Sequence, residues 1–299
     1  MMDWIRDATS PALILGNGIN LYTRRGPSRT WDDLLLRLWK NQTGQERRAL
    51  PEGLSLTEFY DLLEIKNDNA SLQSAFCRGM EEWTPTPAHE AMVRWAQRFG
   101  VPVLTTNFDL NLSRSIGLET MRHLDSRGFT YFYPWKSCFS PEPVTDPASE
   151  FGIWHINGLI NYPKSIRLGL SHYMGSVQRA RAAIQGSSGT SLYARGDGSR
   201  WTGFDSWLHA VFHCDLIIVG LGLKENEVFL RWLLIERARY FRRFPDRRRR
   251  AHYLYSGDAL PRGQEFFFEA IGLESHRFAE YRDLYEGLPA VDLGKTGAS

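Results

Sequence analysis

Cysteine is scarce in this chain, which has three in 299 residues. Cys77, Cys138 and Cys214 are far apart and form no C-x-x-C pair. A disulfide scaffold needs a dense, even set of cysteines and a zinc ribbon needs four, so the sequence excludes both classes. So few cysteines also favour a reducing compartment.

Long apolar runs are missing as well. No stretch approaches the ~18 apolar residues that a membrane-spanning helix needs. The first seven residues include Asp3, Arg6 and Asp7, where a signal peptide would carry an apolar core. We therefore expect a cytoplasmic protein that makes no contact with a membrane.

The chain also lacks a charge excess of one sign, since 36 basic and 34 acidic residues leave a net charge of +2. The whole molecule therefore has no general attraction for nucleic acid. One local exception is residues 242–250, which include six arginines. A solvated loop at a helix end is the simpler interpretation, and an anion-binding patch is the alternative. We expect no direct binding to nucleic acid.

Apolar residues make up 42% of the chain and aromatic residues 13%, which predicts a dense core. Five short, nearly continuous apolar runs are typical of strands buried on both faces. They cover residues 12–15, 101–104, 153–156, 216–219 and 252–255. Helical patterns separate these runs. The sequence therefore predicts an α/β fold with a Rossmann-like, doubly wound, mostly parallel sheet.

We expect one domain over residues 1–299, with two interruptions. The gap between the first two strands, residues 21–100, is too long for one crossover and holds about three or four helices, so it predicts a helical insertion. Helix starts are readable at Thr30, at the Ser55–Glu58 capping box and at Thr86, which precedes a proline. Residues 185–200 are rich in Gly and Ser and predict a mobile loop.

A glycine turn directly follows the first predicted strand, where residues 16–20 are Gly-Asn-Gly-Ile-Asn. Glycines allow the backbone to approach a phosphate closely. The usual dinucleotide pattern is incomplete, because Leu21 stands at the third glycine position and Asp32 and Asp33 open a helix. A tight turn without a ligand is the alternative interpretation.

Residues 105–109, Thr-Thr-Asn-Phe-Asp, follow the second predicted strand. Open α/β sheets bind ligands at the carboxyl ends of their strands. Two hydroxyls, an amide and a carboxylate at such a place can bind ribose hydroxyls and order a water molecule. The alternative is that Thr106 or Asn107 merely caps the next helix.

The third strand ends at residues 154–158, Trp-His-Ile-Asn-Gly. The strand period of two puts His155 and Asn157 on one face and Trp154 and Ile156 on the other. His155 is a candidate general base, although a lone histidine is more often a satisfied structural residue. A later turn, Gly-Leu-Gly at 220–222, is also suited to a close backbone approach.

Taken in order over residues 10–260, these motifs resemble the sirtuin-like NAD-binding family, with the block at 105–109 the most specific match. The type most similar is the bacterial NAD-cleaving effector of antiphage defence, as in Thoeris systems. The resemblance implies an NAD glycohydrolase that releases nicotinamide and ADP-ribose, or a cyclised form. It implies NAD as substrate, no metal, and activation by self-assembly or by a separate ATPase or nucleic-acid-sensing protein.

The resemblance also assigns roles to individual residues. The catalytic residues that it implies are Asn107, Asp109 and His155. The NAD-binding residues that it implies are Gly16, Asn17, Gly18, Ile19, Asn20, Thr105, Thr106, Asn157, Gly220 and Gly222.

Two departures from the family pattern affect this hypothesis. The four-cysteine zinc module of the deacetylases has no counterpart, which disfavours protein deacylation. The family's histidine immediately before the glycine is replaced by Asn157, which cannot accept a proton at neutral pH. A catalytically silent module that binds NAD or ADP-ribose within a defence complex is therefore the alternative.

Overall fold

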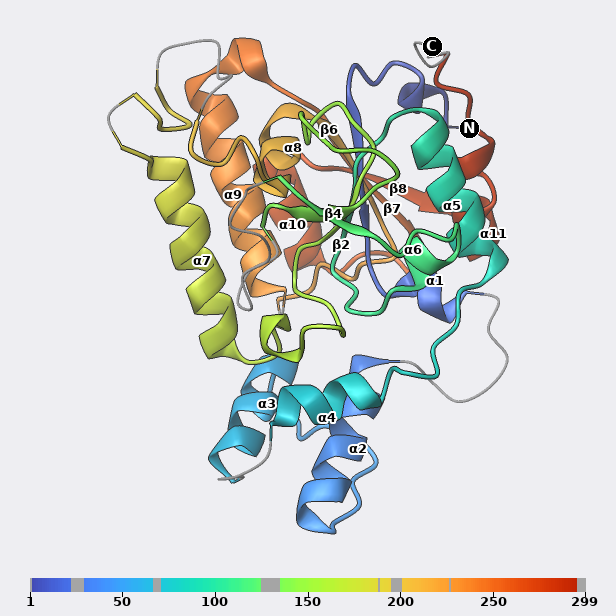
Figure 1. Ribbon diagram of the computed structural model, residues 1–299, viewed down its shortest axis with the longest axis vertical. Helices are drawn as coiled ribbons and strands as arrows, with labels where there is room; N and C mark the ends of the chain where they lie inside the picture. The colour runs from blue at the N-terminus through green and yellow to red at the C-terminus, as the bar shows by residue number, and fades with distance from the viewer. Residues whose placement is uncertain are drawn as a thin grey trace.

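A computed structural model describes residues 2–22, 30–66, 71–124, 135–187, 189–194, 201–225 and 227–294 (Figure 1). Over these residues the chain forms an α/β fold with an eight-stranded mixed sheet and eleven α-helices. The strands are β1 (Pro11–Leu15), β2 (Val103–Thr105), β3 (Met121–His123), β4 (Ser137–Phe139), β5 (Ile153–His155), β6 (Asp215–Val219), β7 (Ala251–Ser256) and β8 (Glu274–Phe278). The predicted mostly parallel α/β sheet is confirmed.

The strand order is β3-β4-β5-β2-β1-β6-β7-β8. All neighbours from β5 to β8 pair in parallel, and β3 and β4 add an antiparallel edge. Each of the five apolar runs in the sequence coincides with one of the parallel strands. The sequence missed β3 and β4, which have three residues each, and β8, whose Glu-Ser-His-Arg-Phe sequence is mostly polar.

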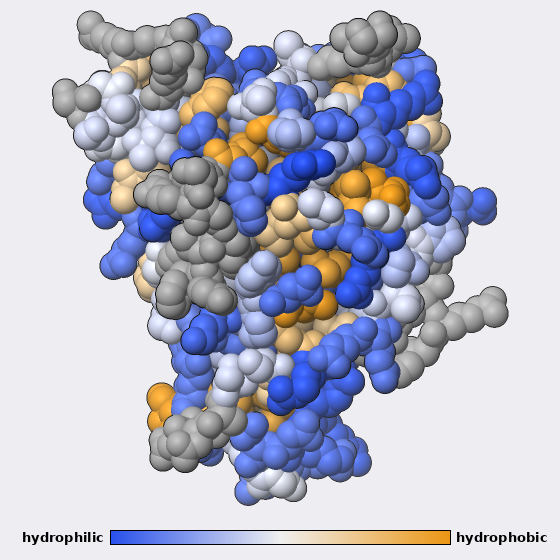
Figure 2. All heavy atoms as spheres, in the orientation of Figure 1, coloured by the Kyte–Doolittle hydropathy of each residue, from blue (hydrophilic) through white to orange (hydrophobic). Residues whose placement is uncertain are grey.

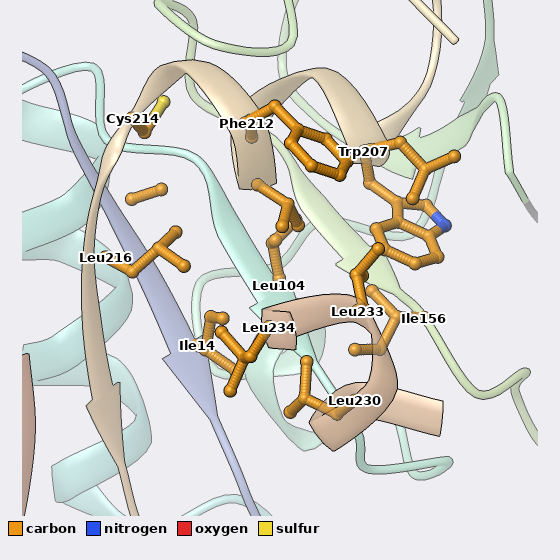
Figure 3. Packing of buried hydrophobic residues seen from close by; sticks show 14 of the residues in the cluster. Ile14, Leu104, Ile156, Trp207, Phe212, Cys214, Leu216, Leu230, Leu233 and Leu234 are labelled. Carbon is orange, nitrogen blue, oxygen red and sulfur yellow. The ribbon is translucent and has the colours of Figure 1, made fainter. Parts of the chain in front are cut away.

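Helices cover both faces of the sheet (Figure 1). One face packs against α7 (Leu170–Gln185), α8 (Trp207–His213), α9 (Val228–Arg243) and α10 (Arg262–Ile271). The other packs against α1 (Gly18–Leu21), α5 (Pro87–Arg98), α6 (Asn111–Arg114) and α11 (Tyr281–Tyr285). Figure 3 shows the first face, where Leu230, Leu233 and Leu234 of α9 pack toward Ile14 and Leu104 of the sheet. This double layer is the predicted doubly wound arrangement.

The helical insertion consists of α2 (Trp31–Thr43), α3 (Leu56–Ile65) and α4 (Leu72–Arg78), which lie together below the sheet (Figure 1). Phe59, Tyr60 and Phe76 are central to its own apolar cluster. Its outer surface is mostly hydrophilic on the face that Figure 2 shows. α5 ends the gap between β1 and β2 but packs on the sheet instead.

The three predicted helix starts are confirmed. Thr30 accepts the backbone N–H of Asp33, Ser55 and Glu58 form a reciprocal capping box, and Thr86 precedes Pro87 at the start of α5. These caps satisfy backbone groups that a helix end leaves without an internal partner.

The predicted Gly/Ser-rich loop is described only in part. Backbone hydrogen bonds within its described part include Leu192 N–H to the Ile184 carbonyl and Thr190 N–H to the Ser187 carbonyl. Residue 188 and residues 195–200 lie outside the described residues. Mobility of this loop stays a prediction.

Within the described part of the chain, no helix is both long enough and apolar enough to cross a membrane.

Candidate functional site at the carboxyl edge of the sheet

The carboxyl ends of four strands stand side by side. Leu15 of β1 pairs with Thr105 of β2 and with Val219 of β6, and Thr105 pairs with His155 of β5. The motifs that follow these strands therefore share one edge of the sheet, as the sequence predicted. The strand order reverses between β1 and β6, which is where open α/β sheets form a ligand-binding crevice.

The two glycine turns of this edge pack directly against each other. Gly18 N–H donates to the Gly220 carbonyl at 2.8 Å, and Gly16 N–H donates to the Val219 carbonyl at 3.0 Å. A Cβ at Gly16 would lie 2.4 Å from the Gly220 oxygen, and one at Gly18 would lie 2.7 Å from the Gly220 Cα. This contact requires glycine at 16 and 18 without any ligand, so phosphate binding by the turn stays a prediction.

Asn20 is the centre of a buried hydrogen-bond network. Its Nδ2 donates to Asp109 Oδ2 at 2.7 Å and to Asn17 Oδ1 at 3.0 Å. Its Oδ1 accepts from Asn111 Nδ2 at 2.9 Å and lies 3.1 Å from His89 Nε2. His89 Nδ1 accepts the Thr86 backbone N–H, so the neutral ring carries its hydrogen on Nε2 and donates it to Asn20. The network ties the first turn to the 105–109 block.

Asp109 and Ile19 are buried beneath this edge of the sheet. The second carboxylate oxygen of Asp109 accepts the Asn111 backbone N–H at 3.0 Å, and the residue is 3% exposed. Both of its oxygens accept from neighbouring amides, and a catalytic role for Asp109 stays a prediction. Ile19 is fully buried in the apolar layer on this face of the sheet.

Hydrogen bonds to Gly16 and Thr105 fix the position of Asn107. Its Nδ2 donates to the Gly16 carbonyl at 3.2 Å, and its backbone N–H donates to Thr105 Oγ1 at 3.1 Å. Thr105 Oγ1 in turn donates to the Leu15 carbonyl. The amide orientation of Asn107 is therefore determined, and its Oδ1 is a buried acceptor with no hydrogen-bond partner among the described residues.

His155 stands beside Asn107 and is held in one tautomer. Its Nδ1 lies 2.8 Å from the Asn107 carbonyl oxygen, which can only accept, so Nδ1 carries the hydrogen. Nε2 then presents a lone pair, and it too is buried without a hydrogen-bond partner among the described residues. Burial lowers the pKa of His155 to about 4, so the ring is neutral at neutral pH. Such an imidazole can accept a proton or a hydrogen bond.

A pocket opens where the insertion meets this edge. Trp31 and Phe76 line it from the insertion, and Thr106, Phe108 and Asn157 line it from the strand ends. The rings of Trp31 and Phe108 meet edge to face at 4.6 Å. The cavity has a volume of about 70 Å³, which is well below the ~300–1,000 Å³ of sites that enclose a drug-sized ligand. Asn107, Asp109 and His155 are buried and are not among its described lining residues.

The sequence did not indicate the ionisable residues that line the pocket, which are Arg167, Tyr173 and Glu227. The Arg167 backbone N–H donates to the Asn157 carbonyl at 2.9 Å, which brings the segment before α7 to the end of β5. Burial raises the pKa of Glu227 to about 7, so this carboxyl can exchange a proton near neutral pH. Arg167 follows the 154–158 motif by nine residues and Glu227 follows the 220–222 turn by five, but neither belongs to a motif that indicates a site.

The three cysteines are buried free thiols, on different parts of the fold. Burial raises the pKa of each thiol to about 12, which makes thiolate ligation unfavourable. The expectation of no metal stays a prediction.

No protein-family model matches the chain, and a search of curated proteins finds no matching relative. A functional assignment therefore depends on the motifs and on the chemistry of the groups at this edge.

Proposed function

We propose that the protein is an NAD glycohydrolase that releases nicotinamide and leaves ADP-ribose or a cyclised form. One observation carries this proposal: Asn107 Oδ1 and His155 Nε2 are two buried acceptors that have no hydrogen-bond partner in the described part of the chain, and a hydrogen bond joins their strand ends. A buried acceptor left without a donor costs about 1–3 kcal/mol. A ligand rich in hydroxyl donors, such as a ribose, would remove that cost.

The two acceptors suit the chemistry of glycosidic cleavage. Breaking the bond between nicotinamide and ribose develops positive, oxocarbenium-like charge on the sugar. Asn107 Oδ1 would orient a ribose hydroxyl or a water molecule and face the developing charge. His155 Nε2 would accept the proton of that hydroxyl or water, because the ring is neutral at neutral pH. Asp109 would act through Asn20, by keeping the edge in place.

The remaining parts of NAD have candidate positions along the same edge. Thr106 and Asn157 line the pocket beside the strand ends and are polar groups suited to the nicotinamide end. The glycine turns at β1 and β6 flank the crevice where the strand order reverses, and they suit the pyrophosphate. Gly222 is the most open of these glycines, since the nearest atom to an added Cβ would be a Lys224 side-chain carbon at 3.6 Å.

A catalytically silent NAD- or ADP-ribose-binding module is the second candidate. Asn157 favours it, because it stands immediately before Gly158 and lines the pocket where the family has a histidine. The lone pair on His155 Nε2 favours the enzyme, because it supplies a base from the same strand end.

The biological part of the proposal follows from the resemblance. It assigns the protein to antiphage defence in the bacterial cytoplasm, where cleavage would deplete NAD. Such an activity needs control, and the resemblance assigns it to self-assembly or to a separate activating protein.

The test is nicotinamide release from NAD by the purified chain over a series of protein concentrations. We expect Asn107→Ala to lower the rate by about two to four decades, the range for loss of one positioned catalytic group. Asn41→Ala, on the exposed side of α2, is the matched control and should retain the wild-type rate. A steep dependence on protein concentration would indicate activation by assembly.

Two results would separate the alternatives. Equal rates for wild type and Asn107→Ala would reject the proposed site. Saturable NAD binding with no cleavage at any concentration would support the silent module.

A further inference from the structure

Two histidines and a glutamate gather at the opposite edge of the sheet, at the amino-terminal ends of β7 and β8. His252 pairs with Glu274 across the parallel strands, so their side chains share one face. His276 is two residues beyond Glu274 and therefore lies on the same face. Their ligand atoms all lie within 4.8 Å of one another.

The distances between these atoms fit a shared metal ion. His252 Nδ1 lies 3.0 Å from His276 Nε2 and 3.4 Å from Glu274 Oε2. Two ligands at ~2.05 Å from a tetrahedral zinc ion are about 3.3 Å apart. Small side-chain rotations would therefore suffice to bring the three atoms into one coordination sphere.

We propose that His252, Glu274 and His276 form a binding site for Zn²⁺ or a similar borderline divalent cation. Two imidazole nitrogens and one carboxylate oxygen are a donor set of this class, whereas Mg²⁺ and Ca²⁺ prefer oxygen ligands alone. Both facing nitrogens must offer lone pairs to the ion. In the hydrogen-bonded pair, one of these nitrogens carries a hydrogen. On metal binding that ring changes tautomer and carries the hydrogen on its other nitrogen, so the charge of the ring stays the same.

Trp4 packs against the two imidazoles, and the exposed side of the site is open to solvent. Trp4 lies in the short helix η1 (Asp3–Ile5), and its ring is tilted against His252, with centroids 3.9 Å apart, and stacked on His276, with centroids 4.5 Å apart. The Glu274 side chain is 64% exposed, so an ion and a water as fourth ligand can enter from solvent. Asp215 is close by, but its two oxygens accept the backbone N–H groups of Thr9 and Arg250.

The position of the site indicates a structural role. β8 is the edge strand and is mostly exposed, so it has little apolar burial to hold it. A cation bound by β7 and β8 under Trp4 would cross-link the edge strand, its neighbour and the amino-terminal segment. This inference is independent of NAD chemistry, which belongs to the other edge of the sheet.

Calorimetric titration of Zn²⁺ alone into the chelator-treated full chain tests the site. We expect one ion to bind per chain in wild type and in the control His123→Ala, a histidine exposed on β3. Glu274→Gln should weaken binding at least tenfold, and its exposure makes a loss of folding unexpected. His276→Ala should abolish binding at this site, and Zn²⁺ should raise the thermal unfolding temperature only where it binds.

A second probe reports the ligand set directly. Co²⁺ bound by two imidazoles and a carboxylate in four-coordinate geometry gives strong visible absorption, which Glu274→Gln should reduce. Zn²⁺ affinities that are the same in wild type, Glu274→Gln and His276→Ala, or no binding in wild type, would overturn the proposal and leave a hydrogen-bonded histidine pair.

Discussion

One backbone carbonyl sets the tautomer of His155, and burial sets the direction of its pKa shift. The Asn107 carbonyl fixes the hydrogen on Nδ1, and burial lowers the pKa of the ring to about 4. The same residue, Asn107, therefore supplies one acceptor through its side chain and sets the tautomer of the other. Because the bond runs to the backbone carbonyl, Asn107→Ala removes the side-chain acceptor and keeps the group that sets the tautomer of His155.

The pH dependence of NAD cleavage tests this state of His155. A histidine of ordinary pKa, about 6.5, would be some tenfold less available as a base at pH 5.5 than at pH 8. With its pKa lowered to about 4, His155 stays neutral over that whole range. We therefore expect the titration of His155 to change kcat/KM for NAD by less than about twofold between pH 8 and pH 5.5.

The sign of the pKa shift also sets the control for that measurement. Because folding lowers the pKa of His155, the unfolded chain binds protons more readily below pH 6.5, and the folded state loses stability as the pH falls toward 4. Circular dichroism at each pH must therefore show an intact fold. An activity limb near pH 6.5 in a folded protein would contradict the assigned state of His155.

At the scale of elements, the turn after β6 meets the turn after β1. Gly220 has a φ of +68°, and a Cβ there would lie 2.5 Å from the Tyr285 hydroxyl. The following loop is fastened by Tyr253, Gln264 and Arg231, which donate to the carbonyls of Leu221, Gly222 and Leu223 at 2.8 Å each. These bonds hold Leu223 at a φ of 46°, which is unfavourable for a side chain with a Cβ.

A pair of glycine variants separates packing between the turns from contact with a ligand. Gly220→Ala combines a positive φ with a steric clash, and we expect it to lower the free energy of unfolding by about 1–3 kcal/mol. Gly222→Ala meets only a flexible lysine side chain and should change that free energy by less than about 0.5 kcal/mol. Urea unfolding measures both values.

The outcome for Gly222→Ala also bears on the ligand. A folded Gly222→Ala with weakened NAD binding would support close approach of the pyrophosphate to this turn. Equal unfolding free energies for the two alanine variants would contradict the packing of the glycine turns.

At the scale of the whole molecule, the sequence predicted the elements that are buried on both faces. β1 and β6 are five-residue, fully buried strands, and such strands give continuous apolar runs. β8 escaped detection because an edge strand needs few apolar residues, and its Glu274 and His276 are polar. The length of the gap predicted a helical insertion over residues 21–100, but the sequence did not indicate that α5 packs on the sheet.

The site was predictable only where it follows a strand directly. Asn107 and His155 end neighbouring strands, so topology alone brings them together. The bond between Asn20 and Asp109 joins residues that are 89 positions apart, and Glu227 reaches the pocket from the start of α9. Such contacts depend on tertiary packing, and no local spacing encodes them. The same holds for His252, which is 22 positions before Glu274.

The most direct test of the central claim is the equilibrium affinity of the purified chain for NAD, since this measurement does not depend on turnover. Calorimetric titration should compare wild type, Asn107→Ala and the control Asn41→Ala. We predict saturable binding by wild type and Asn41→Ala, and at least about tenfold weaker binding by Asn107→Ala, because a lost hydrogen bond of about 1.4 kcal/mol changes affinity tenfold. Unchanged affinity in a folded Asn107→Ala, or no NAD binding by wild type, would contradict the account.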